Sequence, residues 1–258
     1  EALISALGIH ALTRWFLGFP EQGLASAEHA CEAAERLGNP HHLCVLLCSA
    51  RGLLLEFTGN YPKLLTMAAE ALETAHRLGH REGRRWAGIL LGVAQCRTGD
   101  PETGLRTLQP VIDEMLRQGT MLQLPMGLIN AARAWAALGE HDRAMQAAEQ
   151  ALRLIRQRGH RPFETEALRT IGELRLIAKP RAYAAAAVPI REALELARSR
   201  KALSMELRAA TSLARLQCAQ GKSDEALQLL EPVLARFTEG ETLPDLREAS
   251  ALIDLLRR

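Results

Sequence analysis

Cysteine is scarce in this sequence, and its spacing excludes the common cysteine frameworks. The 258 residues contain five cysteines, an odd number, and no two of them form a CxxC pair. An odd set without CxxC spacing does not make a disulfide framework. Free thiols are typical of a reducing compartment, so we expect a cytoplasmic protein.

Long apolar runs and an export signal are also missing. No uninterrupted apolar stretch approaches the roughly 20 residues that a membrane-spanning helix requires, so we predict no membrane partner. The first residues, EALISALG, follow a helical pattern and not the charged and apolar blocks of a signal peptide. They also lack an initiator methionine, so we expect that the chain is a piece of a longer protein.

An excess of charge of one sign is absent as well. The 32 basic and 30 acidic side chains give a net charge of +2, which provides no electrostatic basis for a nucleic-acid partner. The sequence contains no HExxH, GxSxG or GxGxxG motif. We therefore predict no enzymatic activity, no cofactor, and no catalytic, cofactor-binding or metal-binding residues in this chain.

What the sequence does contain is a regular glycine punctuation. A glycine precedes a short polar turn in LGFPEQG, TGNYPKL, TGDPETG, LGEHDRA and QGKSDEA. The intervals between these glycines are 41, 40, 40 and 82 residues, and the longest contains one further turn, AKPRAYA; the glycines are Gly18, Gly59, Gly99, Gly139 and Gly221. This spacing predicts six units of about 40 residues.

The segments between the turns have the composition and periodicity of helices. They are rich in Ala, Leu, Arg and Glu, with apolar residues at i, i+3, i+4 and i+7, as in AMQAAEQALRLI over 144–155. The residue seven positions before each turn is always small, which lets two helices of a hairpin approach closely; these residues are Ala11, Gly52, Gly92, Ala132, Gly172 and Ala214. Each unit is therefore predicted to be a helical hairpin.

These small positions are similar to the signature of tetratricopeptide repeats, in a variant longer than the common unit of about 34 residues. The resemblance implies an all-α fold, a right-handed superhelical solenoid of about six antiparallel helix hairpins. We predict that residues 1–240 form these six repeats and that residues 241–258 form a C-terminal capping helix on one continuous solenoid. Two helices per unit and one cap give about 13 helices.

The C-terminal third carries a more specific resemblance. Residues 204–256, with their segments LARLQCAQG, EALQLLEPVL, FTEG and LPDLREASALIDLL, resemble the closing segment of bacterial multidomain signalling ATPases of the class III adenylate/guanylate cyclase–ATPase–tetratricopeptide type. The resemblance implies a non-catalytic interaction and sensor scaffold, the regulatory C-terminal module of a larger protein with a cyclase, kinase or DNA-binding effector domain. The alternatives are a free-standing tetratricopeptide adaptor and an α-solenoid enzyme. The expected partner is a protein or peptide segment, another domain of the parent chain, or a second copy of the chain.

The stretch PHHLCVLLC is a candidate metal site. His41, Cys44 and Cys48 are spaced i, i+3 and i+7, so they share one face of a helix as three metal ligands would. Cys48, however, lies eleven residues before its turn, where the other units carry Leu, Ala or Gly. We therefore favour buried structural cysteines over zinc ligands, since Cys is commonly buried as a small hydrophobe.

The tetratricopeptide resemblance also implies which positions face an inner groove, namely those six, ten and thirteen residues before each turn. In the second half of the chain they are charged, and we expect a mainly basic groove for an acidic or carboxylate-bearing segment, formed by Arg133, Arg169, Glu173, Arg208 and Arg215. In the first half they are apolar, and we expect an anchor for the same partner at Leu12, Leu53 and Trp86. The alternative is that curvature buries the apolar residues and the charges pair among themselves, Arg169 with Glu173 at i, i+4.

Overall fold

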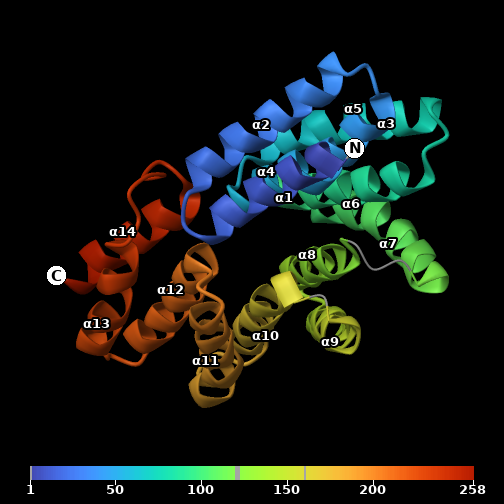
Figure 1. Cartoon of the computed structure of the whole chain (residues 1–258). Helices are drawn as coiled ribbons and strands as arrows, with labels where there is room; N and C mark the ends of the chain where they lie inside the picture. Colours follow the sequence, from blue (N-terminus) through green and yellow to red (C-terminus); the bar gives the residue numbers. More distant parts are fainter. Residues whose placement is uncertain (1, 120–122, 160) are drawn as a thin grey trace.

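The computed structural model describes residues 2–119, 123–159 and 161–258, and over these residues the chain consists of helices and turns without a strand (Figure 1). The first half comprises α1 (Ala2–Phe16), α2 (Pro20–Arg36), α3 (Pro40–Leu46), α4 (Gly52–Phe57), α5 (Tyr61–Arg77), α6 (Arg81–Arg97) and α7 (Pro101–Gln118). The second half comprises α8 (Leu124–Ala137), α9 (His141–Arg158), α10 (Glu164–Ala178), α11 (Tyr183–Ser199), α12 (Leu203–Ala219), α13 (Ser223–Leu234) and α14 (Pro244–Leu256).

A π-helical turn, Leu47–Arg51, joins α3 to α4, so these two segments form one continuous helix. Over the described ranges the fourteen α-helical segments therefore make thirteen helices, six successive pairs followed by α14. The helices within each pair pack against one another, and each pair packs against the next along the chain. This arrangement confirms the predicted all-helical repeat architecture.

Left-handed residues make the turn between the two helices of each pair. Gly59, Gly99 and Gly139 have φ values of 70°, 101° and 80°, a conformation that glycine adopts without steric cost. In the fifth pair, where the sequence lacks a turn glycine, Arg181 takes the same conformation with a φ of 81°. The glycine interval therefore marks a backbone requirement, and one unit meets it with a residue that is strained there.

Close approach of the paired helices explains the small residues before the turns. A Cβ atom placed on Gly92 would lie 2.6 Å from Leu108 Cγ and 3.0 Å from the carbonyl oxygen of Gly104. Gly172 is crowded in the same way by a side chain and a backbone carbonyl of α11. At Gly92 and Gly172 even one methyl group is excluded, because the backbone of one helix lies against the other. Gly52 is crowded instead by side chains of α5 and α6 and by a carbonyl oxygen of its own helix.

The core runs along the chain as neighbouring clusters of buried side chains. The largest takes most of its residues from α1 to α8 and includes Trp15, Leu54 and Ile89. A second cluster extends from α10 to α14 and includes Leu207 and Leu230. Among the described residues, no helix combines the length and the apolar composition needed to cross a bilayer.

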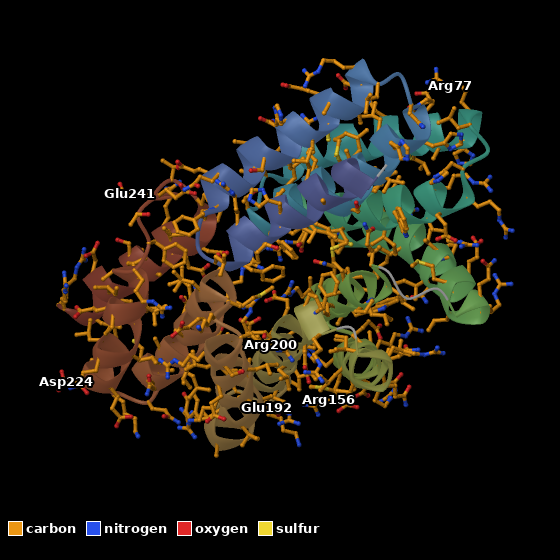
Figure 2. All side chains as sticks on the ribbon, in the orientation of Figure 1. Arg77, Arg156, Glu192, Arg200, Asp224 and Glu241 are labelled. Carbon is orange, nitrogen blue, oxygen red and sulfur yellow. The ribbon has the colours of Figure 1, made fainter. Side chains whose placement is uncertain are left out.

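Ion pairs connect successive units on the outer surface. Figure 2 shows Arg156, Glu192 and Arg200 near one another on the face formed by α9, α10 and α11. Arg156 pairs with Glu192 and with Glu164, and Arg200 donates to Glu164 at 2.7 Å. Arg156 and Glu192 are about half exposed, so their pair contributes about 1 kcal/mol or less to stability, whereas Glu164 is only 14% exposed and is held by both arginines.

The chain curves until its last helices touch its first ones (Figure 1). Ser204 of α12 donates a hydrogen bond from Oγ to the carbonyl oxygen of Trp15 at 2.5 Å. Glu239 accepts hydrogen bonds from the backbone N–H groups of Glu21 and Gln22 at 2.8 and 3.0 Å, which satisfies the N-terminus of α2. We call this junction the end-to-end contact; it closes the solenoid upon itself.

Helix α14 takes part in both the last unit and the end-to-end contact. It packs against α12 and α13, and its Pro244 lies so close to Gly59 that an added Cβ would be 2.9 Å from Pro244 Cγ. The division of the chain into six repeats over 1–240 and a capping helix over 241–258 stays a prediction. The position of α14 nevertheless differs from that of a simple cap, because it bridges the last unit to the second.

Candidate functional site

A polar cavity of about 360 Å³, which we call the charged cavity, opens among helices from most of the repeats. Its wall takes side chains from α4 to α6 on one side and from α8, α10, α12 and α14 on the other. The charged residues that line it are Glu56, Arg97, Arg133, Glu166, Arg169, Glu173, Arg208, Arg215, Asp245 and Glu248. All five charged groove residues predicted from the repeat register therefore meet in one cavity, although they span more than 80 positions of the chain, 133 to 215.

Glu166, on the first turn of α10, is the centre of the ion pairs in this cavity. Its Oε1 accepts hydrogen bonds from Arg133 Nη2 at 2.5 Å and Arg169 Nη2 at 2.6 Å, and Arg208 Nη1 lies 3.8 Å away. Burial alone would raise the pKa of Glu166, but the charges of the three arginines outweigh burial and hold it well below its ordinary value. Glu166 is therefore ionised at neutral pH and fixes three guanidinium groups.

The expectation of a mainly basic groove is wrong for this cavity, because its wall has as many carboxylates as arginines. Five arginines and five carboxylates line the wall. Arg169 pairs with Glu173 at 2.5 Å, as the i, i+4 alternative predicted, and Arg215 pairs with Glu248 of α14. The groove positions of the repeats include Glu173, and also Glu166 thirteen residues before the turn at Lys179, but they do not include the other three carboxylates, which lie on α4 and α14: Glu56, Asp245 and Glu248.

Arg208 connects the charged cavity to the end-to-end contact. Its Nε donates to Asp245 Oδ2 at 2.7 Å, and its Nη2 donates to the backbone carbonyl oxygen of Phe57 at 2.5 Å. Its guanidinium carbon lies 5.2 Å from the ring centre of Trp15 and 5.8 Å from that of Phe57, within the range of cation–π attraction. One side chain of α12 thus holds α14, α4 and α1 together.

Glu56 and Arg97 differ from the other charged residues of the cavity. The side chain of Glu56 is 6% exposed, and its Oε2 has no hydrogen-bond partner among the described residues. Burial raises the pKa of Glu56, because the nearby charges of Arg208 and Arg133 do not compensate for the lost hydration. Arg97 stacks over the ring of Tyr61, with its guanidinium carbon 4.9 Å from the ring centre.

A second cavity of about 310 Å³, the apolar cavity, lies beside the charged one and shares Phe57 with it. Leu12 and Leu53, two of the predicted apolar anchors, line it together with aromatic side chains of α1 and the turn before α10. Trp86, the third predicted anchor, lines neither cavity; it is half-buried and packs against the main core.

The apolar cavity is also lined by three polar side chains, those of His42, Ser49 and Gln123, of which Gln123 lies just before α8 and is fully buried. Its Nε2 donates to the carbonyl oxygen of Cys48 at 2.8 Å, and its Oε1 is buried without a hydrogen-bond partner in the described part of the chain. Cys48 belongs to the π-helical turn, a local widening of the helix that exposes carbonyl groups. No periodicity in the sequence pointed to Gln123, because its left-handed backbone, with a φ of 63°, is rare for a residue other than glycine.

The candidate ligands in PHHLCVLLC do not form a metal centre in the described residues, where no group of three His, Cys, Asp or Glu side chains could hold an ion. Cys44 and Cys48 are buried, and Cys48 belongs to the main core cluster. The ring of His41 instead contacts that of His80, with 5.2 Å between centres. Elsewhere, burial raises the pKa of the Cys31 and Cys96 thiols to about 11, which keeps both protonated at neutral pH.

Comparisons with known proteins show the fold. No protein-family model matches the chain, and no curated protein matches it either. The structure is similar to that of NprR bound to its cognate peptide NprX, with a TM-score of 0.67 and 13% identity over 100% of this chain and 72% of that one. It is also similar to a Rap protein bound to the competence and sporulation factor, with a TM-score of 0.65 and 12% identity over 97% of this chain and 74% of that one.

A third similar structure is the signal transduction ATPase with a tetratricopeptide repeat sensor from Pyrococcus horikoshii, with a TM-score of 0.54 and 15% identity. The match covers 98% of this chain and 38% of the Pyrococcus protein. At these identities the likeness shows a shared fold, the helical-hairpin repeat, which agrees with the tetratricopeptide resemblance of the sequence.

Proposed function

We propose that this chain is a non-catalytic interaction and sensor module whose two adjoining cavities bind a partner segment or ligand. The observation that carries the proposal is the meeting of a charged and an apolar cavity at Phe57. Binding sites in proteins typically combine apolar walls with a few polar groups in fixed positions. Here the apolar cavity supplies buried surface for affinity, and the charged cavity supplies oriented hydrogen-bond donors and acceptors for specificity.

Rigid positioning of the charged side chains supports this proposal. Glu166 holds Arg133 and Arg169, and Asp245 holds Arg208, so a ligand meets guanidinium groups that have already lost their rotamer freedom. The similar structures of NprR and Rap contain bound peptides or factors, and the Pyrococcus protein contains a sensor. Binding in the interior of the solenoid would be in keeping with these proteins.

We further propose that the module is the cytoplasmic regulatory region of a larger bacterial signalling protein. This part of the proposal rests on the resemblance of residues 204–256 to the closing segment of cyclase–ATPase–tetratricopeptide proteins. Sequencing upstream of Glu1 tests it directly: an effector or ATPase domain in the same reading frame supports a regulatory region. A start codon immediately before the first helix would instead favour the free-standing adaptor.

Binding in the interior is tested with two matched variants. Ile9 and Leu37 are both 67% exposed, but Ile9 lines the apolar cavity and Leu37 lines neither cavity. Peptides selected from a random display library against the whole chain should bind the parent and Leu37→Glu equally. They should bind Ile9→Glu at least about tenfold more weakly, since a carboxylate in an apolar site must be desolvated. Peptides that bind both variants equally, or a library that yields no binder, would contradict the proposal.

A further inference from the structure

One arginine and one carboxylate of the charged cavity take no part in its ion pairs. Four of its five arginines and four of its five carboxylates pair with one another. The remaining arginine is Arg97 and the remaining carboxylate is Glu56, and neither forms an ion pair within the described part of the chain. The cavity is therefore neutral in total but has an unmatched charge at two places.

Glu56 occupies the inner wall, where an unpartnered carboxyl oxygen is costly. Its Oε1 accepts only a long hydrogen bond from Asn130 Nδ2, at 3.4 Å, and its Oε2 accepts none from the described residues. The guanidinium groups whose charge acts on it, those of Arg208 and Arg133, are bound to other carboxylates. A ligand that donates a charge-assisted hydrogen bond to this carboxylate would offset this cost.

Arg97 lines the same cavity from the last turn of α6. It is exposed, and its guanidinium carbon lies 4.9 Å from the ring centre of Tyr61. Tyr61 also lies close enough to Glu56 to feel its charge. Burial is the larger cause and the charge of Glu56 the second cause that raise the pKa of the Tyr61 hydroxyl group. Arg97 is therefore an exposed cation and Glu56 a buried carboxylate on the wall of one cavity, with Tyr61 close to both, and the guanidinium group of Arg97 has N–H donors for a carboxylate.

We propose that the charged cavity binds a zwitterion, whose protonated nitrogen donates to Glu56 and whose carboxylate accepts from Arg97. This inference rests on the proposed function, because it names the ligand class of the same interior. A ligand with net charge would leave one of the two residues unmatched, whereas a zwitterion matches both. Free amino acids and short peptides with free termini share this chemistry, and a volume of about 360 Å³ accommodates either.

The test uses the whole chain and two sets of probes, the common free amino acids and the matching alanyl dipeptides. Thermal unfolding in the presence of each probe identifies the binders, because a ligand of the folded state raises the midpoint. Isothermal titration then compares each binder with its N-acetylated and its C-amidated form. We expect each blocked form to bind at least about tenfold more weakly, since one charge-assisted hydrogen bond is lost.

Three variants locate the two charges. Glu56→Gln should weaken binding of the unmodified probe about tenfold or more while the protein remains folded, since it removes a buried charge. Arg97→Gln should weaken the same binding several-fold, whereas Arg106→Gln, an exposed arginine on α7 outside the cavity, should not. A parent affinity that N-acetylation and Glu56→Gln both leave unchanged would overturn the proposal, and so would the absence of any binder in both probe sets. If display peptides still bind in the interior in that case, the proposed function stands and only the zwitterion is excluded.

Discussion

Replacement of Arg208 by methionine should open the end-to-end contact. Methionine keeps an unbranched apolar side chain, but it removes the hydrogen bonds to Asp245 and to the Phe57 carbonyl oxygen and the cation–π contacts with Trp15 and Phe57. A hydrogen bond to a charged group contributes about 1.5–3 kcal/mol, and loss of one partner of a buried ion pair costs about 3–5 kcal/mol. Because Asp245 keeps partial access to water, we expect a total loss near the lower figure, about 3 kcal/mol.

Urea unfolding measures this loss. For a chain of this size a slope of about 3 kcal/mol per molar urea converts it into a midpoint lower by about 1 M. Small-angle scattering in the absence of urea should also show a larger radius of gyration, because the first and last units separate once the bridging guanidinium is gone. Both measurements are needed, since a general loss of stability would change only the midpoint.

Arg215→Met is the matched control for Arg208→Met. Both arginines lie on α12 and line the charged cavity, but Arg215 is exposed and its one ion pair among the described residues is with Glu248. Its replacement should cost about 1 kcal/mol or less and leave the radius of gyration unchanged. If the two variants have the same midpoint and the same radius, Arg208 does not hold the ends together and the reasoning fails.

Three further predictions concern packing, titration and metal content. The free energy of unfolding in urea should be about 1–3 kcal/mol lower for Gly92→Ala than for Gly88→Ala. Both variants gain helix propensity, but only at Gly92 would the new Cβ lie 3.0 Å from a backbone carbonyl oxygen. Equal unfolding midpoints would refute the close approach. Glu56→Gln should be more stable than the parent at pH 7 and equally stable at about pH 4. The raised pKa of Glu56 means that the folded state is destabilised as pH rises from the unfolded value through the folded one; parallel stability–pH curves for the two proteins would contradict this. Elemental analysis should find no stoichiometric zinc, and Cys44→Ser with Cys48→Ser should abolish no metal-dependent transition; about one zinc per chain would restore the metal-site interpretation.

The repeat architecture could be predicted from the sequence because its determinants are local and recur. A turn glycine indicates a left-handed turn, and a small residue seven positions before it indicates a close helix contact. In the second unit Gly59 makes the turn and Gly52 lies at the close contact. The register then placed Arg133 and Arg208 on equivalent faces of α8 and α12, which is why they meet in one cavity. Local spacing carries this information within each unit.

The pairing inside the cavity could not be predicted, because it depends on how far six units rotate in total. Asp245 reaches Arg208 because α14 folds back against α12, and no sequence spacing encodes that packing. Gln123 escaped notice because its role depends on a π-helical turn 75 residues earlier in the chain. Glu56 was overlooked because the register positions considered did not include it, although it is the least satisfied carboxylate of the site.

The end-to-end contact has a consequence for how this protein can change in length. In an open solenoid, stability is nearly a sum over neighbours, and a whole repeat can be duplicated or deleted without disturbing distant ones. Here Ser204 hydrogen-bonds to Trp15, and Glu239 hydrogen-bonds to the start of α2. One repeat more or fewer would change the position of the last units relative to the first, so these hydrogen bonds could not form. The number of repeats is therefore fixed as the number of blades is in a closed propeller, and insertions are tolerated within turns but not as whole units.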